Sequence, residues 1–399
     1  MPDTLCWAPW SSVTINNSGE YRPCCIMFND RDFVKADGTG FNVNEIGDFE
    51  RFMSSKQLVS IREAMLKGEW HDSCYRCKLR EKNGVTSQRQ DYNSMLADKS
   101  TPTGVKLKHL DINFGNKCNL KCRMCYPSMS HLLAKEWPQL GIDDKRPYSK
   151  SYETPNKINV DALKSIIESY SDDIQFIRFG GGEAMVNDEH DELIAWLVDE
   201  NYAENITLFY NTNGTILTDA LLNYWTKFKR VVLSISIDAY GDLNTYIRYP
   251  SSWYVIERNM NKLELYAKDT PHVTVSVSTT IQALNVTRIH ELISWSKEFK
   301  YIRGLPHTKV VTEPKTLDLR VIPKSLRINA SKTLMDEMQT LKTKNHPYFE
   351  RMQKVANMMA QADEPEGMFE KFLDINFKFD KVRKTNLLEI LPELTPFVK

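Results

Sequence analysis

Strand-like and helix-like segments alternate through the middle of the sequence, and this alternation limits the folds that the chain can adopt. Six apolar, β-branched runs predict strands, at residues 107–113, 174–179, 206–211, 231–237, 272–281 and 307–311. Amphipathic patterns between them predict helices, at residues 160–170, 188–199, 219–227, 252–267 and 288–299, with Thr218 and Thr287 where N-caps are expected. Such alternation is typical of parallel β/α units. Six units predict an α/β fold of the (β/α)6 type, an open partial TIM barrel.

A three-cysteine loop directly follows the first predicted strand. Cys118, Cys122 and Cys125 have the spacing C-x3-C-x2-C. Iron–sulfur clusters are usually held by four cysteines, so three thiolates leave one iron of a four-iron cluster open to another ligand. On spacing alone, a zinc loop or a chance group of cysteines is the alternative. Barrel active sites lie at the C-terminal ends of strands, and the loop falls at such an end.

Further polar or glycine-rich motifs follow the next four predicted strands. They are Gly180-Gly181-Gly182-Glu183, Thr212-Asn213-Gly214, Ser236-Ile237-Asp238 with the later Arg248, and a segment that ends at Asn285. Each has a simpler explanation when taken alone. Glycines suit a tight turn, Asn-Gly is a turn former, and an arginine often belongs to a surface ion pair. Their shared position at strand ends favours one common site.

The cysteine spacing and the order of these motifs resemble the radical S-adenosylmethionine (SAM) superfamily. The resemblance implies that SAM binds the open iron through its methionine amino and carboxylate groups. One electron from the cluster then releases a 5′-deoxyadenosyl radical, which abstracts hydrogen from a substrate. The resemblance therefore makes Cys118, Cys122 and Cys125 the catalytic cluster ligands.

The resemblance also assigns residues to the cofactor. Contacts with the methionine amino group, the methionine carboxylate or the nucleoside are expected from Gly181, Gly182, Glu183, Asn213, Ser236, Asp238, Arg248 and Asn285. Of these, Ser236 and Arg248 are expected at the carboxylate, Asp238 orients them, and Asn285 lies near adenine or ribose. Met124 departs from the family pattern, which usually has an aromatic residue next to the last cysteine; a polarisable thioether can also face a ring.

The N-terminal region holds five further cysteines. Cys6, Cys24, Cys74 and Cys77 supply four thiolates, and Cys25 is left over. This array resembles the opening of the SPASM/Twitch module, which binds auxiliary clusters. Because no further cysteine lies between Cys77 and the three-cysteine loop, the resemblance implies one auxiliary 4Fe–4S cluster. A structural zinc would take the same four thiolates, and the spacing leaves open whether Cys24 or Cys25 is the ligand.

Three domains are predicted from these motifs. Residues 1–103 are expected to form the Twitch/SPASM-like module, 104–312 the radical SAM partial barrel, and 313–399 a helical C-terminal extension. Residues 98–104 are read as the linker between the first two. A basic and aromatic run at residues 376–384 is interpreted as the solvated face of a helix.

Composition argues against several functional classes. The 52 Lys and Arg residues balance 52 Asp and Glu residues, which disfavours a nucleic-acid partner such as the substrate of an RNA-modifying radical enzyme. No apolar run of about 18 residues appears, so no membrane span is expected. The N-terminus lacks the features of a signal peptide, which predicts a cytoplasmic protein whose cysteines are metal ligands or catalysts.

These observations predict an enzyme that reductively cleaves SAM and uses two 4Fe–4S clusters. The auxiliary cluster would assist an oxidation or a cross-linking reaction, on a peptide. The alternatives are a radical SAM dehydrogenase or epimerase of a sugar or aminocyclitol, and a non-catalytic iron–sulfur binding protein. A flavodoxin- or ferredoxin-type protein is the expected electron donor.

Overall fold

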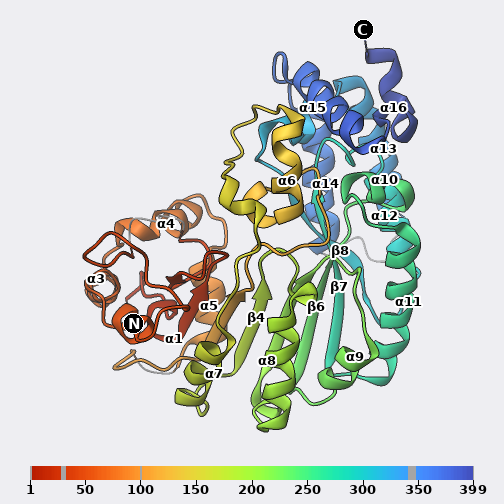
Figure 1. Ribbon diagram of the computed structural model, residues 1–399. Helices are drawn as coiled ribbons and strands as arrows, with labels where there is room; N and C mark the ends of the chain where they lie inside the picture. The colour runs from red at the N-terminus through yellow and green to blue at the C-terminus, as the bar shows by residue number, and fades with distance from the viewer. Residues whose placement is uncertain (1, 28–32, 99–100, 340–346, 399) are drawn as a thin grey trace. The chain divides into compact units, whose positions relative to one another are not determined.

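The computed structural model describes residues 2–27, 33–98, 101–339 and 347–398 (Figure 1). Its strands follow the order β2-β1-β3-β4-β5-β6-β7-β8 in one sheet. Their bounds are β1 Ser12–Ile15, β2 Tyr21–Arg22, β3 His109–Asn113, β4 Phe176–Gly180, β5 Thr207–Thr212, β6 Arg230–Ser236, β7 Val273–Ile281 and β8 Arg303–Val310. The predicted α/β class, a partial TIM barrel, is confirmed.

The helices divide into those of the N-terminal region, those between strands and those of the C-terminal region. The first group contains α1 Ala8–Ser11, α2 Asp48–Met53, α3 Lys56–Leu66, α4 Tyr75–Lys82 and α5 Gln88–Leu96. The second contains α6 His131–Leu140, α7 Val160–Ser169, α8 Asp188–Asp199, α9 Asp219–Trp225, α10 Gly241–Ile247, α11 Trp253–Asp269 and α12 Ile289–Ser296. The third contains α13 Lys324–Gln339, α14 Pro347–Gln361, α15 Met368–Arg383 and α16 Leu387–Ile390, so the predicted helical extension is confirmed.

The six predicted strands correspond to β3 through β8, and two strands were missed. β1 pairs in parallel with β3, with Thr14 opposite Asp111, and β2 pairs antiparallel with β1. Both come from the cysteine-rich N-terminal region, so the sheet has eight strands rather than six. The run that forms β1 has only four residues, which is too short for a periodic signal.

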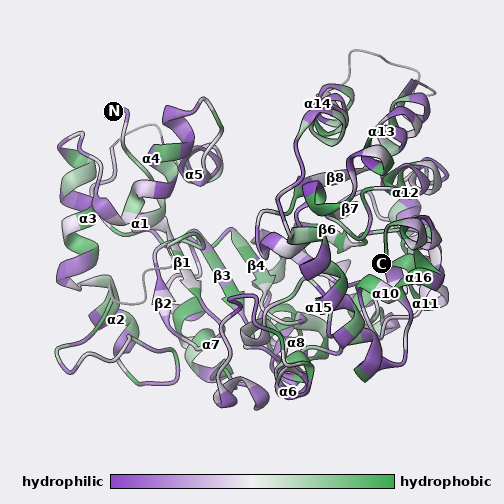
Figure 2. Cartoon of the chain, turned by 90° about the horizontal axis from the view of Figure 1, so that it is seen from above, coloured by the Kyte–Doolittle hydropathy of each residue, from purple (hydrophilic) through white to green (hydrophobic). Residues whose placement is uncertain are grey.

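Contact density divides the chain into two compact units. One comprises Met1–Lys117, Pro155–Tyr210 and Thr218–Val231. In it β3 and β4 pair in parallel, and alternate residues such as Leu110 and Ile177 are fully buried. The apolar faces of α7 and α8 add Leu163, Ile167 and Leu193 to this core. The mixed hydropathy of these amphipathic helices is visible in Figure 2.

The second unit comprises Cys118–Thr154, Asn211–Leu217 and Val232–Lys399. Strand β7 alternates strictly in burial: Val273, Val275 and Val277 are buried, whereas the hydroxyl residues between them are half-buried. Helix α15 packs against α6 through a hydrophobic cluster that includes Leu133, Trp137 and Phe379. In Figure 1 these two helices lie close to each other.

Two local predictions have different outcomes. Thr218 caps α9 as predicted, because its side chain accepts the backbone N–H of Leu221. The cap predicted at Thr287 is wrong, since α12 begins after Arg288 and the Thr287 hydroxyl instead donates to Glu393 at 2.9 Å. Within the predicted linker, residues 99 and 100 lie outside the described residues.

Candidate metal centres and active site

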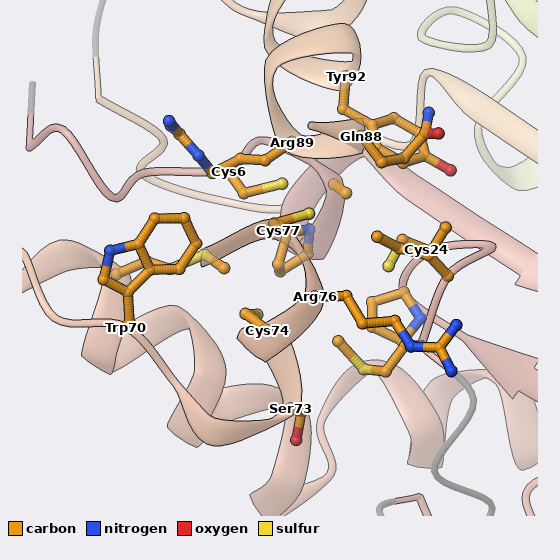
Figure 3. Close-up of a pocket in the computed structure, with 16 residues that line it drawn as sticks. Cys6, Cys24, Trp70, Ser73, Cys74, Arg76, Cys77, Gln88, Arg89 and Tyr92 are labelled. Atoms are coloured by element: carbon orange, nitrogen blue, oxygen red, sulfur yellow. The ribbon is translucent and has the colours of Figure 1, made fainter. Parts of the chain in front are cut away.

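Four N-terminal cysteines line one cavity (Figure 3). Cys6 precedes α1, Cys24 follows β2, and Cys74 and Cys77 stand at the start of α4. Residues three apart on a helix lie on the same face, which brings Cys74 and Cys77 to the same side. The turn before them is fixed by the His71 Nδ1 atom, which accepts the Ser73 N–H at 3.2 Å. The predicted set Cys6, Cys24, Cys74 and Cys77 is therefore brought together.

The cavity disfavours free thiolates. Burial raises the pKa of Cys6 to about 12, and the neighbouring Cys74 and Cys77 add to this shift. Burial also raises the pKa of Cys24 well above its ordinary value. These thiols would ionise only against a compensating positive charge, and bound iron or zinc provides one. The donor set fits a metal centre.

Cys25, the fifth cysteine, does not belong to this set. Its sulfur accepts a hydrogen bond from the Tyr92 hydroxyl at 3.8 Å. Burial raises the pKa of Cys25, with Asp111 raising it further and Arg178 opposing that shift. The cavity is lined by Cys24 and not by Cys25. Of the two adjacent cysteines, Cys24 is the one placed to bind a metal centre.

The distances between these cysteines can be compared with the distances that a single bound metal ion requires. Among the described residues, no three Cys, His, Asp or Glu side chains are close enough together to hold one metal ion. A zinc ion would draw its thiolates to about 2.3 Å from one centre. A four-iron cluster binds each of its four thiolates at a different iron, so it accepts a wider arrangement.

The three-cysteine loop has its own local hydrogen bonds. The Leu120 N–H donates to the Cys118 sulfur at 3.4 Å, and the Cys118 N–H donates to His131 Nδ1 at 3.3 Å. The Cys125 N–H donates to the Cys122 carbonyl at 3.0 Å and closes a turn. A backbone N–H aimed at sulfur favours the thiolate. The loop thus holds its cysteines in a defined order without a helix or strand.

Two backbone hydrogen bonds place Arg248 opposite Cys122. The Lys121 N–H donates to the Tyr249 carbonyl at 2.6 Å, and the Arg123 N–H donates to the Ile247 carbonyl at 2.9 Å. The two donors flank Cys122, and the two acceptors flank Arg248. Burial raises the pKa of the Cys122 thiol, and the Arg248 charge is the largest influence that opposes this rise.

Arg248 forms a buried ion pair, not a surface one. Its Nε atom lies 2.8 Å from Asp238 Oδ2, and the two side chains are 12% and 0% exposed. Burial alone would lower the pKa of Arg248, but the Asp238 carboxylate together with Cys122 and Cys125 outweighs this effect, and the pKa rises. Asp238 is itself fixed by the Thr280 N–H, which donates to Oδ1 at 2.8 Å. The structure therefore brings Asp238 and Arg248 close to the cysteine loop.

The segment Gly180–Glu183 belongs to the first compact unit and approaches the backbone that leads into the loop. A Cβ atom on Gly182 would lie 2.4 Å from the Lys117 carbonyl oxygen, and Gly181 has a φ of +97°. The Glu183 N–H donates to that same Lys117 oxygen at 3.0 Å. This close approach accounts for the glycines without a ligand. The contact of Gly181, Gly182 and Glu183 with a methionine amino group stays a prediction.

The remaining predicted residues lie in the second compact unit. Asn213 donates to Asn119 in the cysteine loop at 2.8 Å. Asn285 is fully buried, and its side-chain amide donates to the carbonyls of Asp238 at 2.7 Å and Thr280 at 2.9 Å. Asn285 therefore supports the end of β6, and its contact with a nucleoside stays a prediction. Ser236 at the end of β6, like Met124 in the cysteine loop, is half-buried.

Two family models match the sequence. Residues 112–295 match the Radical SAM superfamily, and residues 6–78 match SPASM, an iron–sulfur cluster-binding domain. The chain carries a radical SAM domain preceded by a SPASM domain. These domains imply SAM, a 4Fe–4S cluster and an auxiliary iron–sulfur centre, so the predicted cofactor classes are confirmed. No curated protein matches the sequence.

Several solved structures also match the chain. Native anSMEcpe with bound AdoMet has 16% identity and a TM-score of 0.40, over 57% of this chain and 59% of that one. Streptococcus suis SuiB bound to S-adenosylmethionine has 14% identity and a TM-score of 0.38, over 73% and 59%. SuiB bound to the precursor peptide SuiA has 12% identity and a TM-score of 0.36, over 81% and 64%. The chain spans less than two thirds of the length of these proteins.

Sequence reasoning missed the arginine that holds the radical SAM cysteine loop. Arg123 lies between two predicted ligands and is 1% exposed. Its guanidinium bonds Asp380 at 2.6 Å, Asn376 Oδ1 at 3.2 Å and the Tyr246 carbonyl at 3.1 Å, and it stacks 3.7 Å from the Tyr246 ring. The acceptors Asn376 and Asp380 come from α15. The C-terminal extension thereby contacts the cysteine loop.

A second arginine of α15 repeats this arrangement. Arg383 bonds Glu136 of α6 at 2.6 Å and the Lys121 carbonyl at 2.6 Å. The interpretation of residues 376–384 as a solvated helix face is therefore only partly right. Asn376, Asp380 and Arg383 are buried, at intervals of four and three residues that place them on one face of the helix. This spacing was the sequence signal that could have predicted a buried polar face on the helix.

A third arginine, Arg146, follows the loop in the sequence and also bonds to it. Arg146 donates to the carbonyls of Arg123 at 2.7 Å and Cys125 at 2.8 Å, and it pairs with Asp144 at 2.6 Å. Its guanidinium lies 4.5 Å from the centre of the Trp137 ring. Burial raises the pKa of Cys125 to about 12, and Arg146 and Arg248 act against this rise. Cationic side chains therefore favour negative charge at the loop.

Proposed function

We propose that this chain is a radical SAM enzyme that reductively cleaves SAM and abstracts hydrogen from a substrate. The observation that carries the proposal is the pairing of the cysteine loop with the segment around Arg248, inside the region that matches the Radical SAM superfamily. This pairing sets a buried guanidinium beside thiols that can hold an open cluster. A guanidinium beside the cysteine loop suits a carboxylate ligand, which a non-catalytic iron–sulfur protein would not bind.

Each residue of the loop site has a proposed task. Cys118, Cys122 and Cys125 hold a 4Fe–4S cluster, which together with SAM supplies a 5′-deoxyadenosyl radical when both are bound. Arg248 binds the methionine carboxylate, because a planar guanidinium matches a carboxylate and the Asp238 pair fixes its orientation. Ser236, Gly181, Gly182 and Glu183 are the further proposed contacts of the methionine end, and Met124 packs near adenine.

The SPASM domain is proposed to hold one auxiliary 4Fe–4S cluster. Cys6, Cys24, Cys74 and Cys77 saturate its four irons, and their convergence on one cavity supports this assignment. A cluster without an open iron supplies an electron acceptor or relay and not a substrate site. The net reaction is then an oxidation or a cross-link.

A peptide is the proposed substrate, because the chain combines a radical SAM domain with a SPASM domain, a combination that resembles peptide-modifying enzymes. A sugar or aminocyclitol is the alternative. We propose a cytoplasmic location, in which eight free cysteines remain reduced. Among the described residues, none of the helices combines the length and hydropathy needed to cross a bilayer.

Formation of 5′-deoxyadenosine from SAM, with dithionite as reductant under anaerobic conditions, tests the proposal. The triple replacement of Cys118, Cys122 and Cys125 by alanine should abolish it. Replacement of Cys74 and Cys77 should leave some uncoupled formation. Cys25→Ala is the matched control and should behave as the wild type. A triple variant that still forms 5′-deoxyadenosine would show that the loop is not the radical site. Addition of candidate peptides or sugars that raise the wild-type rate would identify the substrate class.

A further inference from the structure

A pocket of about 400 Å³ adjoins the radical SAM cysteine loop. One of its lining residues, Lys121, is part of the loop and immediately precedes Cys122. The other lining residues are Leu132, Lys135, Glu136, Gln139, Tyr249, Val382 and Arg383, from α6, α15 and the segment after Arg248. Val382 also packs against the hydrophobic cluster between α6 and α15, as Cys125 does. The pocket is thus close to Cys122, through the neighbouring Lys121, and to Cys125, through the hydrophobic cluster that Val382 also contacts.

The pocket carries an excess of positive charge. It contains three cationic side chains and one carboxylate, that of Glu136. Glu136 is 4% exposed and already pairs with Arg383 at 2.6 Å and Lys121 at 2.7 Å. Its charge is therefore directed inward and does not offset Lys135, which is exposed at the rim.

Exposed lysines extend this charge along the end of α15. Lys381 and Lys384 flank the pocket residues Val382 and Arg383 in the sequence, and both are exposed. In the described part of the chain, Lys135, Lys381 and Lys384 have no ion pair with a carboxylate. Two lysines of the basic run at residues 376–384, Lys381 and Lys384, are thus left without a carboxylate partner among the described residues. We name Lys135, Lys381, Lys384 and the pocket the basic face.

We propose that the basic face is the docking surface for a small acidic protein that delivers one electron to the loop cluster. The proposal rests on the proposed function, because only a redox centre at the loop needs such a partner. The carrier is oxidised by one electron, and the cluster is reduced by one. An acidic carrier matches three unpaired lysines, and complementary charge raises the rate of encounter 10- to 1000-fold at low salt. The lining also includes Leu132 and Val382, whose apolar surface suits a short-lived complex.

The test compares two reductants on the full-length reconstituted protein. Dithionite needs no docking site, whereas a reduced flavodoxin does. The variant Lys135→Glu/Lys381→Glu/Lys384→Glu reverses the charge of the face without altering any residue assigned to the loop site. Its matched control, Lys227→Glu/Lys229→Glu/Lys268→Glu, makes the same charge change at three exposed lysines elsewhere. Formation of 5′-deoxyadenosine is measured for both at several flavodoxin and salt concentrations.

For the basic-face variant, we expect kcat/KM for flavodoxin to fall about 10-fold or more at low salt and the difference to shrink as salt increases. The dithionite-driven rate should stay within about two-fold of the wild type. An equal loss in both triple variants would overturn the inference, as would an equal loss with both reductants. Flavodoxin kinetics that are unchanged in the basic-face variant at low salt would also overturn it. Absence of 5′-deoxyadenosine from wild type with dithionite would instead refute the proposed function.

Discussion

Asp380 holds the C-terminal extension to the cysteine loop, and its removal should destabilise the second compact unit. Its carboxylate accepts hydrogen bonds from Arg123 at 2.6 Å, from the Thr385 hydroxyl at 2.6 Å and from the Leu387 N–H at 2.7 Å. In the variant Asp380→Ala, the Arg123 guanidinium loses its only anionic partner among the described residues, while it remains 1% exposed.

The magnitude follows from this burial. Removal of one member of a buried ion pair costs about 3–5 kcal/mol, because the other charge is left without compensation. Arg123 keeps its bonds to Asn376 and Tyr246, so we take the lower end, about 3 kcal/mol. For a unit of about 200 residues, each kcal/mol lowers the Tm by about 2–4 °C. The Tm of this unit should therefore fall by about 6–12 °C.

Thermal unfolding followed by circular dichroism measures the shift. Asp374→Ala is a matched control on the same helix, because Asp374 forms an exposed pair with Lys378 at 2.8 Å. It should change the Tm by no more than about 2 °C. The double variant Arg123→Met/Asp380→Leu removes both charges and should recover most of the lost stability. A Tm for Asp380→Ala within about 2 °C of the wild type, or a double variant no more stable than Asp380→Ala, would refute the reasoning.

Three other predictions concern the metal centres, SAM and pH. Reconstituted protein should contain about eight irons per chain; Cys24→Ser should retain about four and Cys25→Ser all of them, and the opposite result would exchange their roles. Arg248→Ala should weaken SAM binding in equilibrium titration by roughly 30- to 1000-fold, with partial recovery in Arg248→Lys; unaltered affinity would assign the carboxylate to another residue. Burial, aided by Arg178, lowers the pKa of His109 to about 3. The unfolded chain then binds a proton that the folded chain does not, so stability is lost as pH falls from about 6.5 towards 3, by about 1.4 kcal/mol per pH unit. His109→Asn should reduce that slope in urea unfolding, and an unchanged slope would exclude His109 as its source.

The sequence predicted the parts of the fold and site that depend on local patterns. The strand β7 alternates apolar and hydroxyl residues over nine positions, so its limits were predicted to within one residue. The loop cysteines and Arg248 follow predicted strands, so the strand predictions were enough to place them at the same end of the sheet. The start of β8 was missed by four residues, because Arg303–Pro306 has neither alternation nor a clear apolar face.

The missed features depend on contacts between distant segments. The position of Cys25 outside the cavity that Cys24 lines depends on Tyr92, Asp111 and Arg178. These residues lie far along the chain and meet Cys25 only after β1, β3 and β4 pair. The buried role of Arg123 depends on α15, more than 250 residues away in the sequence. Neither spacing nor composition contains that information.

The docking of α15 and the binding of a cluster act on the same short loop. The loop residues 118–126 form no regular helix or strand, and their order comes from carbonyls of residues 247 and 249 and from three arginines. Arg383 opposes the rise that burial causes in the pKa of Cys122, and Arg146 does the same for Cys125, which offsets part of the cost that burial places on thiolate formation. A ligand that binds only the ordered loop stabilises that order by mass action. Loss of the Asp380 contact should therefore lower the affinity of the loop for iron, and cluster binding should in turn raise the stability of the helix that contacts it.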